Sequence, residues 1–219
     1  MSSNPIRGVS QSRREFLKRS AVMAVAAAPA LSVARAAHAA GSDVIRIGMI
    51  GCGGRCTGAA ADAMTADPAT RLVAMTDPFL DRVHAKREAL RKAKPEQVQV
   101  DDDHCFCGLD GYRKVIESVD YVLIACAAKF HPMYAKAAVE AGKHVFVEKP
   151  HGIDPWGVKV MLQAAEIAKE KNLGLLSGLQ SRFSAPIRET IQRVHDGQIG
   201  DIVAIEENYL RGPYGRTDR

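Results

Sequence analysis

Short apolar runs recur along the chain from residue 44 and alternate with stretches whose apolar residues are spaced as on one face of a helix. The runs are continuously apolar, which is typical of parallel strands buried on both faces. We expect strands over residues 44–50, 72–76, 121–125, 144–147 and 173–177. We expect helices over residues 58–66, 80–92, 112–117, 133–141, 156–171 and 185–196. This alternation predicts an α/β fold with a doubly wound parallel sheet that is covered by helices on both faces.

The first 39 residues differ in character from the rest of the chain. Arg13 and Arg14 stand in the sequence Ser-Arg-Arg-Glu-Phe-Leu-Lys, a mild apolar stretch covers residues 21–34, and Ala-His-Ala at 37–39 suits a signal peptidase. We interpret residues 1–39 as a twin-arginine signal, which predicts export to the periplasm by the twin-arginine machinery. The apolar stretch is short and contains Pro29, so no stable membrane span is expected. An N-terminal helix with chance arginines is the alternative.

The formal net charge of +5 belongs to this leading segment. Residues 1–39 hold six Arg or Lys side chains against one Glu, whereas residues 40–219 carry 24 basic and 24 acidic side chains. The body of the chain therefore lacks the electrostatic footprint of a nucleic-acid-binding protein, and that class of partner is excluded. The five cysteines are odd in number, and Cys105 and Cys107 are closer together than zinc ligands usually are. We interpret the cysteines as buried small apolar residues and expect no metal site.

The link between the first predicted strand and the next helix is rich in glycine. Gly51 would permit a tight turn there, and Gly53 would let the backbone approach a pyrophosphate at the helix N-terminus. Gly54 and Arg55 follow in the same turn and are counted with the cofactor-binding residues. The third position of the dinucleotide-binding fingerprint holds Cys56 in place of Gly or Ala, which weakens the match.

An acidic residue stands where this fingerprint needs one. Asp77 closes the second predicted strand, 21 residues beyond Cys56. A carboxylate there accepts hydrogen bonds from the adenosine ribose and would repel a 2′-phosphate, which favours NAD over NADP. A glycine-rich first turn also occurs in methyltransferases and in ordinary strand–helix turns, so these residues alone leave the chemistry open.

The strand at 144–147 runs directly into Glu148, Lys149 and Pro150. In a doubly wound sheet, ligands bind beyond the carboxyl ends of the strands, so Lys149 would emerge at the mouth of a cofactor cleft. An ammonium group there could polarise a substrate oxygen and stabilise an alkoxide during hydride transfer. A merely solvated Glu-Lys pair at a strand end is the alternative.

The order and spacing of several motifs resemble those of the Gfo/Idh/MocA oxidoreductases, the family of glucose–fructose oxidoreductase and inositol dehydrogenase. The motifs are Gly51-x-Gly53, residues 125–132 (ACAAKFHP), residues 138–145, Glu148-Lys149-Pro150, and residues 178–183 (GLQSRF). The resemblance covers about residues 44–210 and implies a Rossmann domain. It also implies NAD(P)-dependent hydride transfer with a sugar- or polyol-like substrate.

The resemblance further implies a role for each matching residue. Gly51 and Gly53 would contact the pyrophosphate, and Asp77 the adenosine ribose. Ala127 and His131 would lie near the nicotinamide ribose. For His131 the alternative is a residue that begins a helix and contacts no ligand.

At the other end of the cofactor, Glu148 and Lys149 would line the nicotinamide side, with Lys149 as the catalytic residue that contacts the reacting oxygen. Gln180 and Arg182 match a segment that runs beside the cofactor. The Lys149–Pro150 bond is often cis in such proteins.

The resemblance also suggests how the chain is divided. We expect a signal over 1–39, the dinucleotide-binding domain over 40–180, and a connecting helix with the first strand of a truncated α+β domain over 181–219. That strand would be the β-like run at 202–208. The general acid/base histidine of the family usually lies on the second domain, so we expect this chain to bind cofactor but to lack that group. A longer form could be a homo-oligomer. The alternatives are a non-catalytic nucleotide-binding module and a methyltransferase.

Overall fold

The computed structural model describes residues 43–210 and residue 212. Its centre is a six-stranded sheet in the order β3-β2-β1-β4-β5-β6, and every neighbouring pair is parallel. The strands are β1 (Ile45–Ile50), β2 (Thr70–Asp77), β3 (Cys105–Cys107), β4 (Tyr121–Ile124), β5 (His144–Val147) and β6 (Leu175–Ser177). The strand order reverses at β1, which places the topological switch point between β1 and β4. The predicted doubly wound α/β fold is confirmed.

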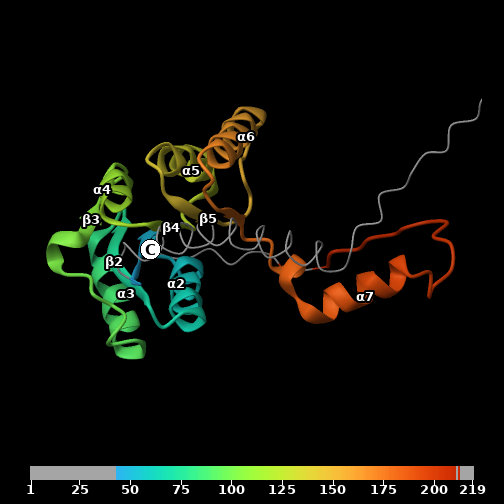
Figure 1. Cartoon of the computed structure of the whole chain (residues 1–219), viewed down its shortest axis with the longest axis horizontal. Coiled ribbons are helices and arrows are strands. Elements are labelled where there is room, and N and C mark those ends of the chain that lie inside the picture. Colours follow the sequence, from blue (N-terminus) through green and yellow to red (C-terminus); the bar gives the residue numbers. More distant parts are fainter. Residues whose placement is uncertain (1–42, 211, 213–219) are drawn as a thin grey trace, which may run out of the picture.

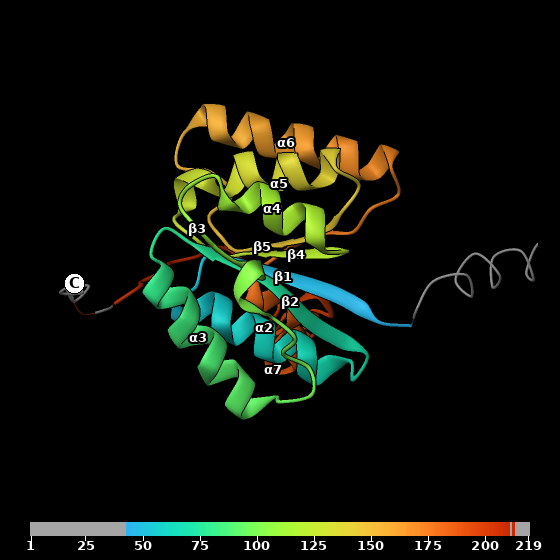
Figure 2. The same cartoon turned by 90° about the vertical axis from the view of Figure 1, so that its left-hand side faces the viewer.

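Helices cover both faces of the sheet. On one face lie α2 (Gly54–Ala66) and α3 (Leu80–Ala93), and on the other lie α4 (Gly111–Ser118), α5 (His131–Glu140) and α6 (Pro155–Glu170) (Figure 2). Three short 3-10 helices lie in the connections: η1 (Asp102–His104) before β3, η2 (Ala128–Phe130) after β4 and η3 (Gln180–Phe183) after β6. Helix α7 (Ala185–His195) extends away from the sheet beyond η3, and its residues are exposed or half-buried (Figure 1).

Each face of the sheet has its own buried core. The cluster on the α4–α6 face includes Val115, Ile124 and Val139, and the cluster on the α2–α3 face includes Met49 and Leu72. Continuous burial of the strands on both sides explains why their sequences are apolar without alternation. The packing brings the carboxyl ends of β1, β2, β4 and β5 to one edge, where the loops carry the predicted site.

Two elements differ from the predictions made from the sequence. The run at 202–208 forms no strand in the described part of the chain, and Val203 and Ile205 are 95% and 83% exposed. A strand needs a neighbour for its ladder, and no described segment pairs with this run, so its assignment as the first strand of a further domain stays a prediction. Conversely, strand β3 was not predicted, because a run of three residues is too short to show the apolar pattern of a strand.

Smaller differences concern α2 and the cysteines. Helix α2 begins at Gly54, four residues before its predicted start, because the glycine turn itself supplies the first helical residues. All five cysteines are free thiols, but Cys107 is exposed at the edge of the sheet and Cys126 is half-buried, so the expectation of uniform burial is wrong for these two. Among residues 43–210, no helix is long and apolar enough to cross a membrane. The predicted signal over 1–39 lies outside the described residues.

Candidate functional site

The turn after β1 has a backbone that only glycine adopts easily. Gly51 has a φ of +97°, and a Cβ built on it would lie 2.9 Å from the Cα of Cys126. Its N–H donates to the carbonyl of Thr76 at 2.8 Å, which ties the turn to the end of β2. The close approach of the turn to Cys126 therefore depends on the missing side chain.

The N-terminus of α2 is open. Gly53 is its N-cap in an extended conformation, and no described side chain caps the first turn. A Cβ built on Gly53 or Gly54 would meet no described atom within 4 Å. The first turn contains Arg55 and no acidic residue. Uncapped N–H groups and the positive end of the helix dipole suit an anion, so these residues fit a pyrophosphate.

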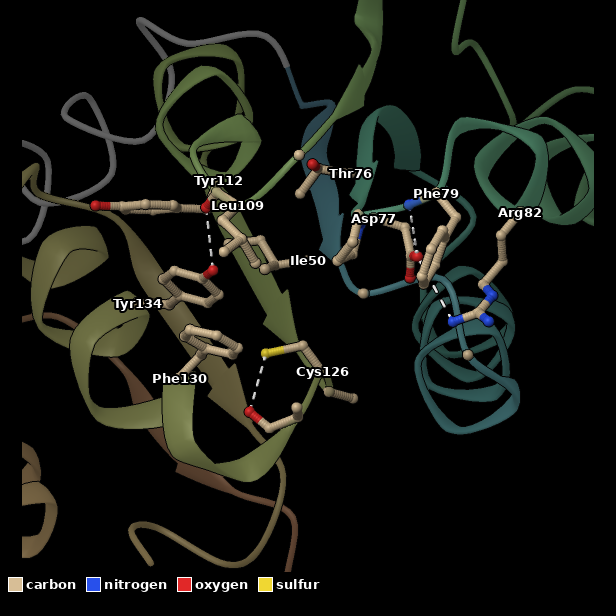
Figure 3. Close-up of a pocket in the computed structure, with 16 residues that line it drawn as sticks. Ile50, Thr76, Asp77, Phe79, Arg82, Leu109, Tyr112, Cys126, Phe130 and Tyr134 are labelled. Carbon is tan, nitrogen blue, oxygen red and sulfur yellow. Dashed lines mark hydrogen bonds and ion pairs between the residues drawn. The ribbon is translucent and has the colours of Figure 1, made fainter. Parts of the chain in front are cut away.

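Asp77 joins the ends of two loops through its carboxylate. The side chain is 5% exposed, and Oδ2 accepts from the N–H of Cys52 at 2.8 Å. Oδ1 accepts from the N–H of Phe79 at 3.2 Å (Figure 3). The guanidinium of Arg82 lies 3.6 Å from Oδ1 and 5.0 Å from the centre of the Phe79 ring. A carboxylate can accept about four hydrogen bonds, so Asp77 retains capacity for a ribose hydroxyl.

A cavity of about 300 Å³ opens between the glycine turn and Asp77 on one side and a group of aromatic rings on the other (Figure 3). The Tyr112 and Tyr134 rings stack at 4.3 Å, and Phe130 lies 5.5 Å from Tyr134. The hydroxyl of Tyr134 donates to the carbonyl of Leu109 at 3.1 Å, and burial raises its pKa to about 12. A polar carboxylate opposite an apolar aromatic wall suits a ribose joined to a flat base.

A second cavity of about 770 Å³ adjoins the first, because Ala125 and Cys126 line both. Lys149 lines this second cavity and is exposed, whereas the neighbouring Glu148 is 5% exposed. One oxygen of Glu148 lies 2.6 Å from Nε of Arg55, and the other accepts from the N–H of Lys149 at 3.2 Å. The charged strand end predicted from the sequence is therefore part of a cleft that begins at the glycine turn.

The ring of His131 is held by the main chain. Nδ1 lies 2.8 Å from the carbonyl oxygen of Pro150, and Nε2 lies 3.1 Å from that of Cys126. The residue begins α5, is 1% exposed, and lines the second cavity. Its ring thus connects the turn after β4 to the corner after β5, where the Lys149–Pro150 bond is cis.

The predicted site residues fall into two groups. Gly51, Gly53, Asp77 and Ala127 line the first cavity. Arg55, His131, Glu148, Lys149, Gln180 and Arg182 line the second. Gly54 begins α2 beside them.

Several lining residues of the first cavity were not predicted: Phe79, Arg82, Leu109, Tyr112, Phe130 and Tyr134. Phe79 and Arg82 follow Asp77 closely in sequence, so proximity to the acid could have indicated them. Tyr112 and Tyr134 carry no such signal, because they reach the cavity from α4 and α5 on the far side of the switch point.

The thiols near the cleft are poor nucleophiles. Burial raises the pKa of Cys52 and of Cys126 to about 12, and it raises that of Cys56 as well. Cys56 occupies the third fingerprint position with no exposed surface, and its Sγ lies 3.6 Å from the carbonyl oxygen of Leu123. The position therefore accepts a thiol without separating α2 from the sheet. Within the described residues, no group of three potential metal ligands is present.

Comparisons with known proteins point to one family. Residues 45–175 match the family model GFO_IDH_MocA, described as an oxidoreductase family with an NAD-binding Rossmann fold. Glycosyl hydrolase family 109 protein 1 of Bacteroides fragilis is 29% identical over 171 residues, which is 77% of this chain and 35% of that protein. The chain spans between about a third and a half of the length of the curated relatives it matches.

Two solved structures show the same arrangement of strands and helices. The scyllo-inositol dehydrogenase of Lactobacillus casei, with bound NAD(H) and scyllo-inositol, is 26% identical with a TM-score of 0.55 over 72% of this chain and 43% of that one. A mutant 3-ketoreductase from Actinomadura kijaniata, in complex with TDP-benzene and NADP, is 25% identical with a TM-score of 0.55 over 73% and 44% of the two chains. One neighbour thus holds NAD(H) and the other NADP.

Proposed function

The chain belongs to the Gfo/Idh/MocA oxidoreductase family, and we propose on that premise that its two adjoining cavities bind the two halves of a nicotinamide dinucleotide for hydride transfer with a sugar- or polyol-like substrate. The observation that carries this proposal is the position of Lys149. It lines the far end of a cleft whose near end is formed by the glycine turn and Asp77.

The first cavity suits the adenosine half of the cofactor. Its aromatic wall would pack against the base, Asp77 would accept from the ribose, and the open N-terminus of α2 would receive the pyrophosphate. We infer that NAD is preferred to NADP. The buried carboxylate of Asp77 would lie against a 2′-phosphate, and Arg82, which could compensate such a charge, already lies 3.6 Å from that carboxylate.

The second cavity would hold the nicotinamide half and the reacting part of the substrate. When bound, the cofactor supplies a hydride acceptor or donor. The ammonium of Lys149 would hold the substrate oxygen and stabilise the negative charge that develops on it, a contribution typically worth about 10²–10³ in rate. The relatives support a carbohydrate-like substrate, since their names include a glycosyl hydrolase and an inositol dehydrogenase.

Calorimetric titration of the full chain with NAD⁺, NADH and S-adenosylmethionine tests the cofactor assignment. We expect both nicotinamide forms to bind and S-adenosylmethionine not to bind. Binding of S-adenosylmethionine alone would favour a methyltransferase and overturn the proposal.

Turnover separates the enzyme from a non-catalytic nucleotide-binding module. The assay uses a panel of sugars and polyols, together with nitrophenyl glycosides because one relative is named as a glycosyl hydrolase. With a substrate that turns over, Lys149→Met should keep the affinity for NADH within about twofold and lower the rate by about 10²-fold. Lys159→Met, an exposed lysine on α6, is the matched control and should change neither. Because this chain is expected to lack the acid/base histidine, the assay is run both on the chain itself and on the chain joined to the second domain of a relative. Dinucleotide binding without turnover in both forms would favour the non-catalytic module.

We also propose that the protein is exported through the twin-arginine pathway and processed near residue 40. The support is the sequence of residues 1–39 alone, with Arg13 and Arg14 ahead of a mild apolar stretch. Replacing both arginines by lysine should leave unprocessed protein in the cytoplasm. Normal periplasmic processing of that variant would refute the signal.

A further inference from the structure

Three segments of the chain meet around the buried carboxylate of Glu148. Its Oε1 lies 2.6 Å from Nε of Arg55 in the first turn of α2, and its Oε2 accepts from the N–H of Lys149. On the remaining side it packs against Gly178, where a built Cβ would lie 2.5 Å from Oε1. Burying a charged carboxylate costs desolvation free energy, and here the hydrogen bonds from Arg55 and from the N–H of Lys149 offset that cost.

Arg55 brings its charge from the glycine turn to the neighbourhood of Lys149. Its side chain is half exposed, and its guanidinium lies 5.8 Å from the centre of the Phe146 ring. Arg55, Lys149 and Arg182 all line the second cavity, and Glu148 is the only carboxylate among the described residues that line it. Without Glu148, the described charges in this cavity would all be positive.

We propose that the Glu148–Arg55 pair sets the preference of this site between the oxidised and the reduced cofactor. Glu148 offsets the positive charge of Arg55 beside Lys149, so that an oxidised nicotinamide ring, which is itself positively charged, is not disfavoured there. This inference rests on the proposed function, since it requires the nicotinamide half of the cofactor to occupy the second cavity.

The ratio of two dissociation constants isolates this effect. NAD⁺ and NADH share the adenosine, both riboses and the pyrophosphate, and they differ in the charge of the nicotinamide ring. Any effect on the shared parts cancels in the ratio of their dissociation constants. Removing one elementary charge a few ångströms away in a partly solvated cavity should change that ratio by about tenfold, which corresponds to about 1.4 kcal/mol.

The test is calorimetric titration of the full chain and its variants with NAD⁺ and with NADH at one fixed ionic strength. Glu148→Gln keeps the shape and one acceptor oxygen, and it should raise Kd(NAD⁺)/Kd(NADH) by about tenfold. Arg55→Gln should lower the ratio, and the double variant should return it to within about threefold of the starting value.

The control removes a carboxylate elsewhere. Glu140 is an exposed residue at the C-terminal end of α5, where it pairs with Lys136, and His131 at the other end of the same helix lines the cavity. Glu140→Gln should leave the ratio unchanged, because nine residues of helix place it about 14 Å farther along the axis. Thermal unfolding of every variant checks that the fold is retained.

The outcomes separate this inference from the proposed function. If the unmodified chain binds neither NAD⁺ nor NADH, the proposed function fails. If it binds both, and Glu148→Gln weakens both equally, then the pair is only a structural clamp and the inference is overturned while the function stands. If Glu148→Gln does not fold, the half-exposed Arg55→Gln decides alone, and an unchanged ratio in that variant overturns the inference.

Discussion

Replacing Asp77 by alanine should weaken both the fold and the proposed preference for NAD, by amounts that the structure allows to be separated. The largest cost in stability comes from the N–H of Cys52, which would lose its acceptor in a place with no exposed surface. An unsatisfied buried donor costs about 1–3 kcal/mol. The guanidinium of Arg82, 3.6 Å from Oδ1, is half exposed, so its interaction with Asp77 adds little. The free energy of unfolding should therefore fall by about 2–3 kcal/mol.

The effect on binding has a different origin. The carboxylate would accept hydrogen bonds from the adenosine ribose, and a hydrogen bond to a charged group is worth about 1.5–3 kcal/mol. The Kd for NADH should therefore rise by about 10- to 100-fold. The Kd for NADPH should rise much less, because the same substitution removes a negative charge from beside the 2′-phosphate.

Urea unfolding gives the first quantity, and titration with NADH and NADPH in parallel gives the second. Asp77→Asn is the matched control, since its side-chain oxygen can still accept from Cys52 while the charge is gone. It should recover most of the stability and little of the discrimination. Equal losses for the two reduced cofactors in Asp77→Ala would refute the ribose assignment, and unchanged urea unfolding would refute the role of Asp77 in holding the two loops.

Four further predictions concern the backbone, the thiols and the dependence of stability on pH. Gly51→Ala should lower the free energy of unfolding by about 1–3 kcal/mol in urea, since the residue has a φ of +97° and little room; unchanged unfolding would mean that the turn is not strained. At pH 7.5 iodoacetamide should label the exposed Cys107 in the folded protein, whereas buried Cys52, whose pKa is raised to about 12, should react only after unfolding, as peptide mass mapping would reveal. The raised pKa of Cys52 means that its protonated thiol stabilises the fold fully below the ordinary thiol pKa, and that this stabilisation is lost as pH rises toward 12. The free energy of unfolding of Cys52→Ala should therefore fall less steeply above about pH 9 than that of the unmodified protein. Equal slopes for the two proteins would show that Cys52 does not contribute to the alkaline loss of stability. On the acid side, the hydrogen bond from Arg46 lowers the pKa of Asp120, so its stabilisation is lost as pH falls through that lowered pKa. Asp120→Asn should remove this part of the acid dependence, by less than about 1 kcal/mol for a half-exposed pair.

Residues whose position depends on local geometry could be placed from the sequence. Gly51 and Asp77 sit at fixed positions in a strand–turn–helix unit, and Lys149 lies just beyond the end of β5, a strand that the apolar pattern indicated. The tyrosines of the first cavity could not be found in this way, because Tyr112 and Tyr134 meet only after α4 and α5 pack side by side on the sheet.

The same limit applies to the charges and strands. The Arg55–Glu148 pair joins residues 93 positions apart, and its existence depends on how far α2 leans over the end of β5. The run at 202–208 has a β-pattern, but the pattern carries no information about a neighbour. What the sequence lacks in each case is the distance between elements, which arises from packing rather than from the order of residues.

The reversal of strand order at β1 assigns the two ends of the cleft to two different halves of the sheet. Asp77 belongs to the β1–β2–β3 half, and Glu148 and Lys149 belong to the β4–β5–β6 half. Of the residues that the structure describes, only Ala125 and Cys126 line both cavities. Groups without shared partners contribute to free energies nearly additively. In the described part of the chain, Asp77 and Lys149 have no bonding partner in common, so the effects of substitutions at these two residues should add nearly independently. Arg55 and Glu148 are the exception, because their ion pair joins the glycine turn to the strand end beyond the switch point, and substitutions there should be felt at both ends of the cleft.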